Sequence, residues 1–136
     1  MIGKQFTLYL ENRPGVLANV TRLLAQAKIN LEGISASAGS DVALVQIVVS
    51  HAAKTKTVLN RASIAFTVQD VALLPLCNRP GALARVVGAL AKAGVNINYI
   101  YATTCAGGRN CDSNVVISAP DLRLVEREWT HAVSRC

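Results

Sequence analysis

The chain repeats one sequence pattern at a spacing of 66 residues. The segment Asn12–Ala18, with the sequence NRPGVLA, recurs as NRPGALA at Asn78–Ala84. At the same spacing Gln5–Ala38 aligns with Val71–Thr104, and 15 of the 34 aligned pairs are identical. Chance does not account for this agreement, so we interpret the chain as two copies of one module.

We expect the first module to span residues 1–69 and the second to span residues 70–136. Hydrophobic residues make up 51% of the sequence and aromatic residues only 4%, which predicts an aliphatic core. A domain of roughly 60 residues buries only about 60% of the surface that its unfolded chain exposes. We therefore expect the two modules to pack together.

Charge and hydropathy narrow the possible partners. No apolar run approaches the roughly 18 residues of a membrane span, and the start Met1–Lys4 has no features of a signal peptide. We therefore expect a cytoplasmic protein without a membrane partner. The net charge is +6, but residues 1–70 and residues 71–136 each carry seven basic and four acidic residues, without a basic cluster. This distribution argues against a nucleic-acid partner.

The hydrophobic periodicity predicts the order strand, helix, strand, strand, helix, strand in each module. The first strand alternates apolar residues at Phe6, Leu8 and Leu10, and Pro14 suits the first position of the following helix. In the first module the later elements are expected at 29–38, 42–49, 51–61 and 64–68. In the second module they are expected at 95–104, 114–118 and 121–131, with a very short last strand at 133–136. Trp129 falls on the apolar side of the last helix and is expected in the core.

Right-handed crossovers fold this order into an antiparallel sheet with the strand order 4-1-3-2 and both helices on one face. The predicted fold class is therefore α+β, with two ferredoxin-like βαββαβ modules in tandem. This architecture by itself fixes no function.

The reactive side chains do not form a recognisable catalytic or metal site. The four cysteines include no Cys-x-x-Cys pair, so we expect no metal and no cofactor. We find no nucleophile–base pair, carboxylate pair or phosphate loop, and we expect no enzyme. Cys105 and Cys111 flank a predicted turn, Gly107–Asn110, where they are either free thiols or an oxidised pair.

The segments Glu11–Leu17 and Lys28–Leu31 resemble the start of an ACT domain, and so do Cys77–Leu83 and Gly94–Ile97. Over residues 1–136 the chain resembles small stand-alone proteins with two ACT domains in tandem. The Asn-Arg-Pro-Gly loop is similar to the loop of the serine-sensing regulatory domain of phosphoglycerate dehydrogenase.

This resemblance implies an amino-acid ligand held where two ACT domains pair, by an Asn of the loop and an Asn at a strand start. The candidate ligand-binding residues are Asn12, Arg13, Pro14, Gly15, Val16, Leu17 and Asn30 in the first module, and Asn78, Arg79, Pro80, Gly81, Ala82, Leu83 and Asn96 in the second. The family member with the serine site has a His where this chain has Leu10 and Leu76. That departure favours a ligand with an apolar part, or a site that is no longer used.

The residue chemistry of the loop agrees with a zwitterionic ligand. A glycine at a helix start leaves the backbone N–H groups open, and the positive helix end attracts a carboxylate. An Asn amide offers both a donor and an acceptor. The alternative is that Asn12 and Asn78 cap their helices, that Asn30 and Asn96 satisfy strand backbone, and that Arg13 and Arg79 are solvated.

Two functional hypotheses follow from the sequence. The first is a regulatory protein that binds an amino acid and acts on a target enzyme in trans. The second is an assembly module with vestigial sites that is indifferent to ligand. An open sheet edge in the second module favours a homodimer in either case.

Overall fold

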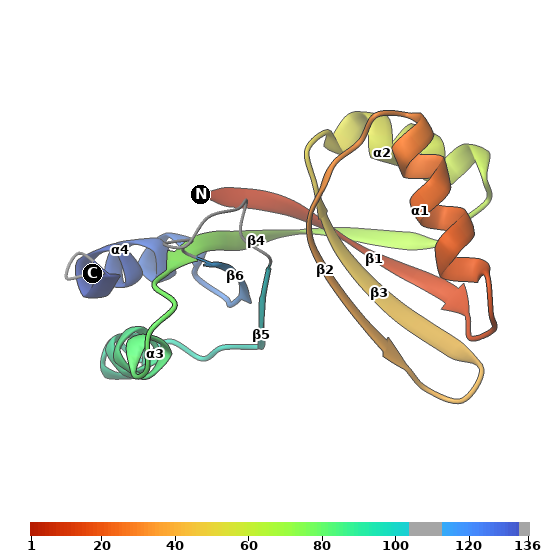
Figure 1. Ribbon diagram of the computed structural model, residues 1–136. Coiled ribbons are helices and arrows are strands. Elements are labelled where there is room, and N and C mark those ends of the chain that lie inside the picture. The colour runs from red at the N-terminus through yellow and green to blue at the C-terminus, as the bar shows by residue number, and fades with distance from the viewer. Residues whose placement is uncertain (104–112, 134–136) are drawn as a thin grey trace. The chain divides into compact units, whose positions relative to one another are not determined.

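The computed structural model describes residues 1–103 and 113–133 of the 136-residue chain (Figure 1). Its elements follow the predicted alternation of strands and helices. In chain order they are β1 (Ile2–Glu11), α1 (Val16–Gln26), β2 (Leu31–Ala38), β3 (Val42–Val49), α2 (Ala52–Arg61), β4 (Phe66–Leu76), α3 (Ala82–Lys92), β5 (Tyr99–Ala102), β6 (Ser113–Ser118) and α4 (Leu122–Val133). The α+β class and the pair of ferredoxin-like modules are confirmed.

The chain divides into two compact units. One unit is Lys4–Gln69, and the other combines Asp70–Cys136 with Met1–Gly3. The strands β1 and β4 each contribute residues to both units.

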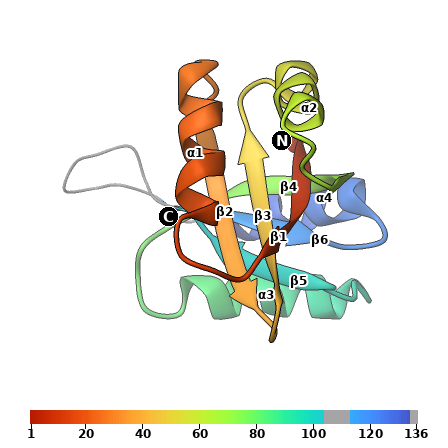
Figure 2. The same ribbon diagram turned by 90° about the vertical axis from the view of Figure 1, so that its right-hand side faces the viewer.

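In the unit Lys4–Gln69 the strands lie in the order β2-β3-β1-β4, which is the predicted order 4-1-3-2. Pairing of β1 with β3 places Phe6 opposite Ile47 and Leu8 opposite Val45. These side chains face α1 and α2 and form a buried core with Val20, Leu24, Ile29 and Leu59 of the same unit. Figure 2 shows the two helices side by side on one face of the strands.

In the second unit β4 pairs with β6, and β6 pairs with β5. The strand face that carries Ala72, Leu74, Val115 and Ile117 packs against α3 and α4 through Val86, Leu90, Val125 and Trp129. Trp129 is fully buried, and its Nε1 donates a hydrogen bond to the carbonyl oxygen of Pro75 at 2.7 Å. The prediction that Trp129 belongs to the core is confirmed.

The expectation of a short last strand at 133–136 is wrong for Val133, because α4 continues through that residue. Residues 134–136 lie outside the described part of the chain. Residue Met1 pairs with β4 instead: its carbonyl oxygen accepts a hydrogen bond from the Leu73 N–H at 2.8 Å. The Met1 amino group donates to the Leu73 carbonyl at 3.2 Å and lies 2.6 Å from Glu126 Oε1 of α4.

Several element boundaries differ from the prediction. The helices α1 and α3 begin after the loop glycine rather than at the proline. Gly15 and Gly81 have positive φ angles, which do not occur inside a right-handed helix. The strand expected at 95–104 is only four residues long, Tyr99–Ala102. The strands expected at the end of one module and the start of the next form one continuous strand, β4.

Cys77 is the one cysteine among the described residues, and it is buried and disulfide-bonded. Cys105 and Cys111, whose redox state the sequence left open, fall outside the described residues, as does the turn predicted at Gly107–Asn110.

Candidate functional site

The loop between β1 and α1 is shaped by Gly15. Its φ of +86° lies in the left-handed region, where glycine carries no penalty, and α1 begins at the next residue. A Cβ added to Gly15 would meet no atom within 4 Å, so the space beside the backbone is open. No side chain caps the start of α1, where the positive end of the helix dipole attracts an anion. Gly81 repeats this geometry before α3, with a φ of +84°.

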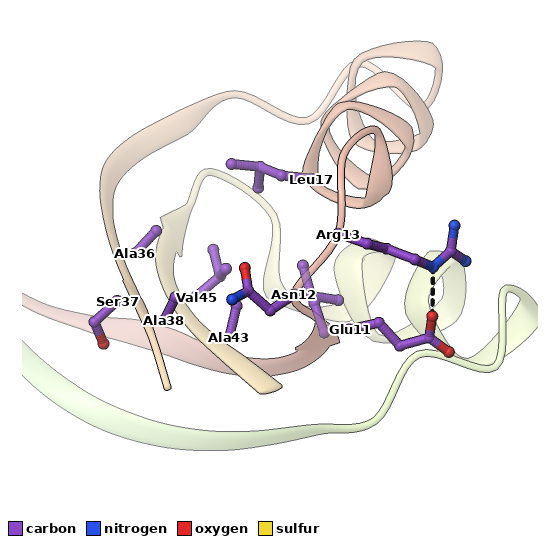
Figure 3. A pocket seen from close by; sticks show the side chains of 10 residues that line it. Glu11, Asn12, Arg13, Leu17, Ala36, Ser37, Ala38, Ala43 and Val45 are labelled. Atoms are coloured by element: carbon purple, nitrogen blue, oxygen red, sulfur yellow. Dashed lines mark hydrogen bonds and ion pairs between the residues drawn. The ribbon is translucent and has the colours of Figure 1, made fainter. Parts of the chain in front are cut away.

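Asn12 lies at the end of β1 and is tied to the turn between β2 and β3. Its Nδ2 donates to the carbonyl oxygens of Gly39 at 3.4 Å and Ser40 at 3.2 Å, and its backbone N–H donates to Asp41 at 2.8 Å. The alternative of a helix cap is therefore wrong for Asn12. Figure 3 shows the side-chain oxygen directed toward Leu17, and this atom has no protein partner among the described residues.

A cavity of about 210 Å³ opens between the start of α1 and the ends of β1, β2 and β3 (Figure 3). Its lining is mainly aliphatic and small. The apolar residues are Leu10, Leu17, Ala36, Ala38, Ala43 and Val45, and the polar ones are Glu11, Asn12, Arg13 and Ser37. The loop thus places a polar edge, made by Asn12 and the open helix end, beside an apolar hollow.

Arg13 is held by its neighbour Glu11. The Arg13 Nε lies 2.5 Å from Glu11 Oε2, and both side chains are largely exposed. Figure 3 shows this pair on the side of the loop away from Ala36, Ser37 and Ala38.

The second loop lacks this ion pair. Cys77 occupies the position of Glu11, and within the described ranges Arg79 has no ion-pair partner. The repeated arginines therefore have different electrostatic surroundings.

The Asn residues predicted at the strand starts lie far from the loops of their own units. The register pairs Glu11 with Val42 at one end of β3, whereas Leu31 pairs with Val49 at the other end. Asn12 and Asn30 therefore lie at opposite ends of the sheet in their unit. Asn30 is exposed, and its backbone N–H donates to Ser50 Oγ at 3.0 Å.

Asn78 and Asn96 are separated in the same way. Leu76 pairs with Ser113, and Tyr99 pairs with Ser118 at the other end of β6. Each unit by itself therefore brings together the loop residues but not the two Asn residues.

The remaining predicted loop residues fall into two groups. Exposed positions are Pro14, Gly15, Leu17, Asn78, Arg79, Pro80, Gly81 and Leu83, whereas Val16 is half-buried and Ala82 is buried. Sequence reasoning missed the residues of β2 and β3 that line the cavity. A signal existed, because Ala36 is one of the identical pairs of the repeat, with Ala102 as its counterpart.

The described residues contain neither a metal-binding cluster nor a membrane-spanning helix. In 1–103 and 113–133 there is no cluster of His, Cys, Asp and Glu that could hold a metal ion. Over the same ranges no helix is both long and apolar enough to span a membrane.

A family model described as "ACT domain pair" matches residues 1–111. Among solved structures, protein BT0572 from Bacteroides thetaiotaomicron is 32% identical, with a TM-score of 0.84, covering 96% of this chain and 88% of that one. The regulatory subunit of aspartate kinase from Thermus thermophilus, in a ligand-free form, is 19% identical with a TM-score of 0.69, covering 96% and 92%. The corresponding subunit from Thermus flavus is 17% identical with a TM-score of 0.63 and the same coverage. No curated protein matches the chain.

Proposed function

The chain belongs to the ACT domain pair family, and from this premise we propose that it is a regulatory protein that binds an amino acid. In this proposal residues 1–69 and 70–136 are the two ACT domains. The ligand lies against the Asn-Arg-Pro-Gly loops, Asn12–Gly15 and Asn78–Gly81, and an Asn from the strand start of a paired domain completes each site.

The observation that carries the proposal is the cavity beside the first loop. An amino acid has a carboxylate, an ammonium group and a side chain, and each meets a suitable group here. The uncapped start of α1 attracts a carboxylate. The free oxygen of Asn12 accepts a hydrogen bond from an ammonium group, and the cavity of about 210 Å³ receives the side chain.

The solved structures support the regulatory part of the proposal. Two of them are regulatory subunits of aspartate kinase, and this chain matches 92% of the length of each. We further propose that ligand binding is passed to a separate target enzyme.

The proposal is tested by thermal denaturation of the full chain with each common amino acid at millimolar concentration. A ligand that binds only the folded state stabilises it by about 2.7 kcal/mol at a hundred times its Kd. We expect at least one amino acid to raise the Tm, and the double variant Asn12→Ala with Asn78→Ala to lose the effect while staying folded.

Asn60→Ala is the matched control, because Asn60 is an exposed asparagine of α2 outside both loops. This variant should keep the full ligand response. A Tm that no amino acid changes would refute the proposal.

The second candidate function, an assembly module, is favoured by apolar residues on the edge strands. Ile34 of β2 is 44% exposed and its repeat counterpart Ile100 of β5 is 36% exposed, each on the edge strand of its unit. Exposed edges pair readily with a second chain. This alternative predicts a homodimer by sedimentation equilibrium whose stability does not depend on any amino acid.

A further inference from the structure

We infer that the cavity in the first module selects an amino acid with a small aliphatic side chain, and that Glu11 determines this specificity by holding Arg13 away from the ligand. This inference rests on the proposed function and names the ligand class for the loop at Asn12–Gly15.

The preference for a small aliphatic side chain is inferred from the residues that line the cavity. Six of the ten lining residues are Leu, Ala or Val, and they come from β1, α1, β2 and β3. An aliphatic side chain placed here exchanges water for apolar contact. Glu11 and Arg13 are the two charged residues of the lining, and they pair with each other, so a charged ligand side chain would lose water without gaining an unpaired partner there.

The volume of the cavity limits the size of the ligand side chain that it can receive. A volume of about 210 Å³ exceeds the roughly 150 Å³ of an engineered cavity that binds benzene. It is below the roughly 300–1,000 Å³ of pockets for drug-sized ligands. The branched side chain of valine or leucine therefore fits this volume, and the small aliphatic lining favours it.

The role of Glu11 is inferred from a comparison of the two loops. Arg13 and Arg79 occupy the same place in the repeat, yet only Arg13 has a carboxylate two residues earlier. Cys77 stands at that position in the second loop, where it is buried and disulfide-bonded. Glu11 is thus the residue that cancels the charge of the loop arginine in the first module. Without it, the Arg13 guanidinium is free to bind an acidic ligand side chain through paired hydrogen bonds.

The test is isothermal titration calorimetry of the full chain with valine, leucine, serine, lysine, glutamate and phenylalanine. At the site that Asn12→Ala removes, we expect valine or leucine to bind at least about tenfold more tightly than the other four. One methylene in an apolar pocket already changes binding by about 10- to 200-fold. Ala36→Leu fills the cavity and should weaken aliphatic binding by at least about tenfold.

Ala102→Leu is the matched control, since Ala102 is the repeat counterpart of Ala36 on β5. It should leave the Asn12 site unchanged. Ala36→Val, a smaller change that suits a strand, serves if Ala36→Leu does not fold.

Glu11→Gln tests the role of the ion pair. Exposed ion pairs are worth about 0.2–1 kcal/mol, so we expect the affinity for glutamate to rise about 1.4- to fivefold relative to leucine. An unchanged ratio would overturn the role of Glu11.

The outcomes separate the inference from the proposed function. If serine, lysine, glutamate or phenylalanine binds most tightly at the Asn12 site, the inference is wrong and the proposed function stands. If Ala102→Leu rather than Ala36→Leu abolishes aliphatic binding at that site, the cavity assignment is wrong. If none of the common amino acids binds, the proposed function fails, and the inference fails with it.

Discussion

Asn12 uses the two ends of one amide group differently. Its nitrogen holds the turn between β2 and β3 through the carbonyls of Gly39 and Ser40. Its oxygen stays unpaired within the described protein and is directed toward Leu17 (Figure 3). One residue therefore both fixes the cavity wall and offers an acceptor to a ligand. Replacing it should weaken binding and loosen the turn together.

Tyr101 gives a prediction about pH at the residue scale. Burial of the side chain, and to a lesser extent the charge of Tyr99, raises the pKa of Tyr101 above its ordinary value. The two rings stack with centroids 6.3 Å apart. Because the folded state disfavours the phenolate, the free energy of unfolding should fall as the pH rises above about 10.

Urea denaturation at a series of pH values up to pH ~11 measures this loss. The variant Tyr101→Phe has no phenol to ionise and should show a smaller decline. Equal declines in the two proteins would show that Tyr101 is not responsible.

The long helices α1 and α3 begin at glycines for a conformational reason. Gly15→Ala and Gly81→Ala force a side chain into the left-handed region, and each should cost about 1–2 kcal/mol of unfolding free energy. Gly88 is the internal control, because it lies within α3 and a Cβ there would meet nothing within 4 Å. Gly88→Ala should stabilise the protein by about 0.4–1 kcal/mol.

Denaturant unfolding of the three variants measures these differences. Destabilisation by Gly88→Ala would contradict the helix geometry described here. Neutral effects at Gly15 and Gly81 would contradict the loop geometry.

At the scale of the elements, the N-terminal residues belong to the second unit, where Met1 contacts β4 and α4. Met1 and Leu73 exchange backbone hydrogen bonds beside β4, and the Met1 amino group pairs with Glu126. A chain that begins at Lys4 should therefore exchange the Leu73 amide hydrogen much faster than the full chain. Hydrogen exchange followed by mass spectrometry or NMR measures this. Unchanged protection at Leu73 would show that Met1 does not protect it.

At the scale of the whole molecule, most of the fold could be predicted from the sequence repeat. The shared pattern of Leu17, Val20 and Leu24 with Leu83, Val86 and Leu90 placed both long helices correctly. The strand order of the unit Lys4–Gln69 also followed from the element order. Local periodicity and crossover handedness are properties of the chain itself, so sequence reasoning reaches them.

The structure differs from the sequence-based predictions where a feature depends on residues that are far apart in the chain. The place beside β4 is taken by Met1, and no periodicity in the second module signals a strand from the other end of the chain. The cavity depends on the register that brings Ala38 opposite Ala43, which a list of loop residues does not contain. The ion pair of Arg13 with Glu11 is formed by residues close in the chain. The difference in charge between the two loops becomes visible only when both loops are compared.

The central claim is that a small aliphatic amino acid, with leucine as the probe, binds at the loop and cavity of the first module. The most direct measurement is a titration of the isotope-labelled full chain with leucine, followed by amide NMR spectra. We predict saturable shifts at Asn12–Leu17 and at Ala36–Ala38, which enclose the cavity. Spectra that leucine does not change, or saturable shifts confined to residues outside the loop and cavity, would contradict the claim.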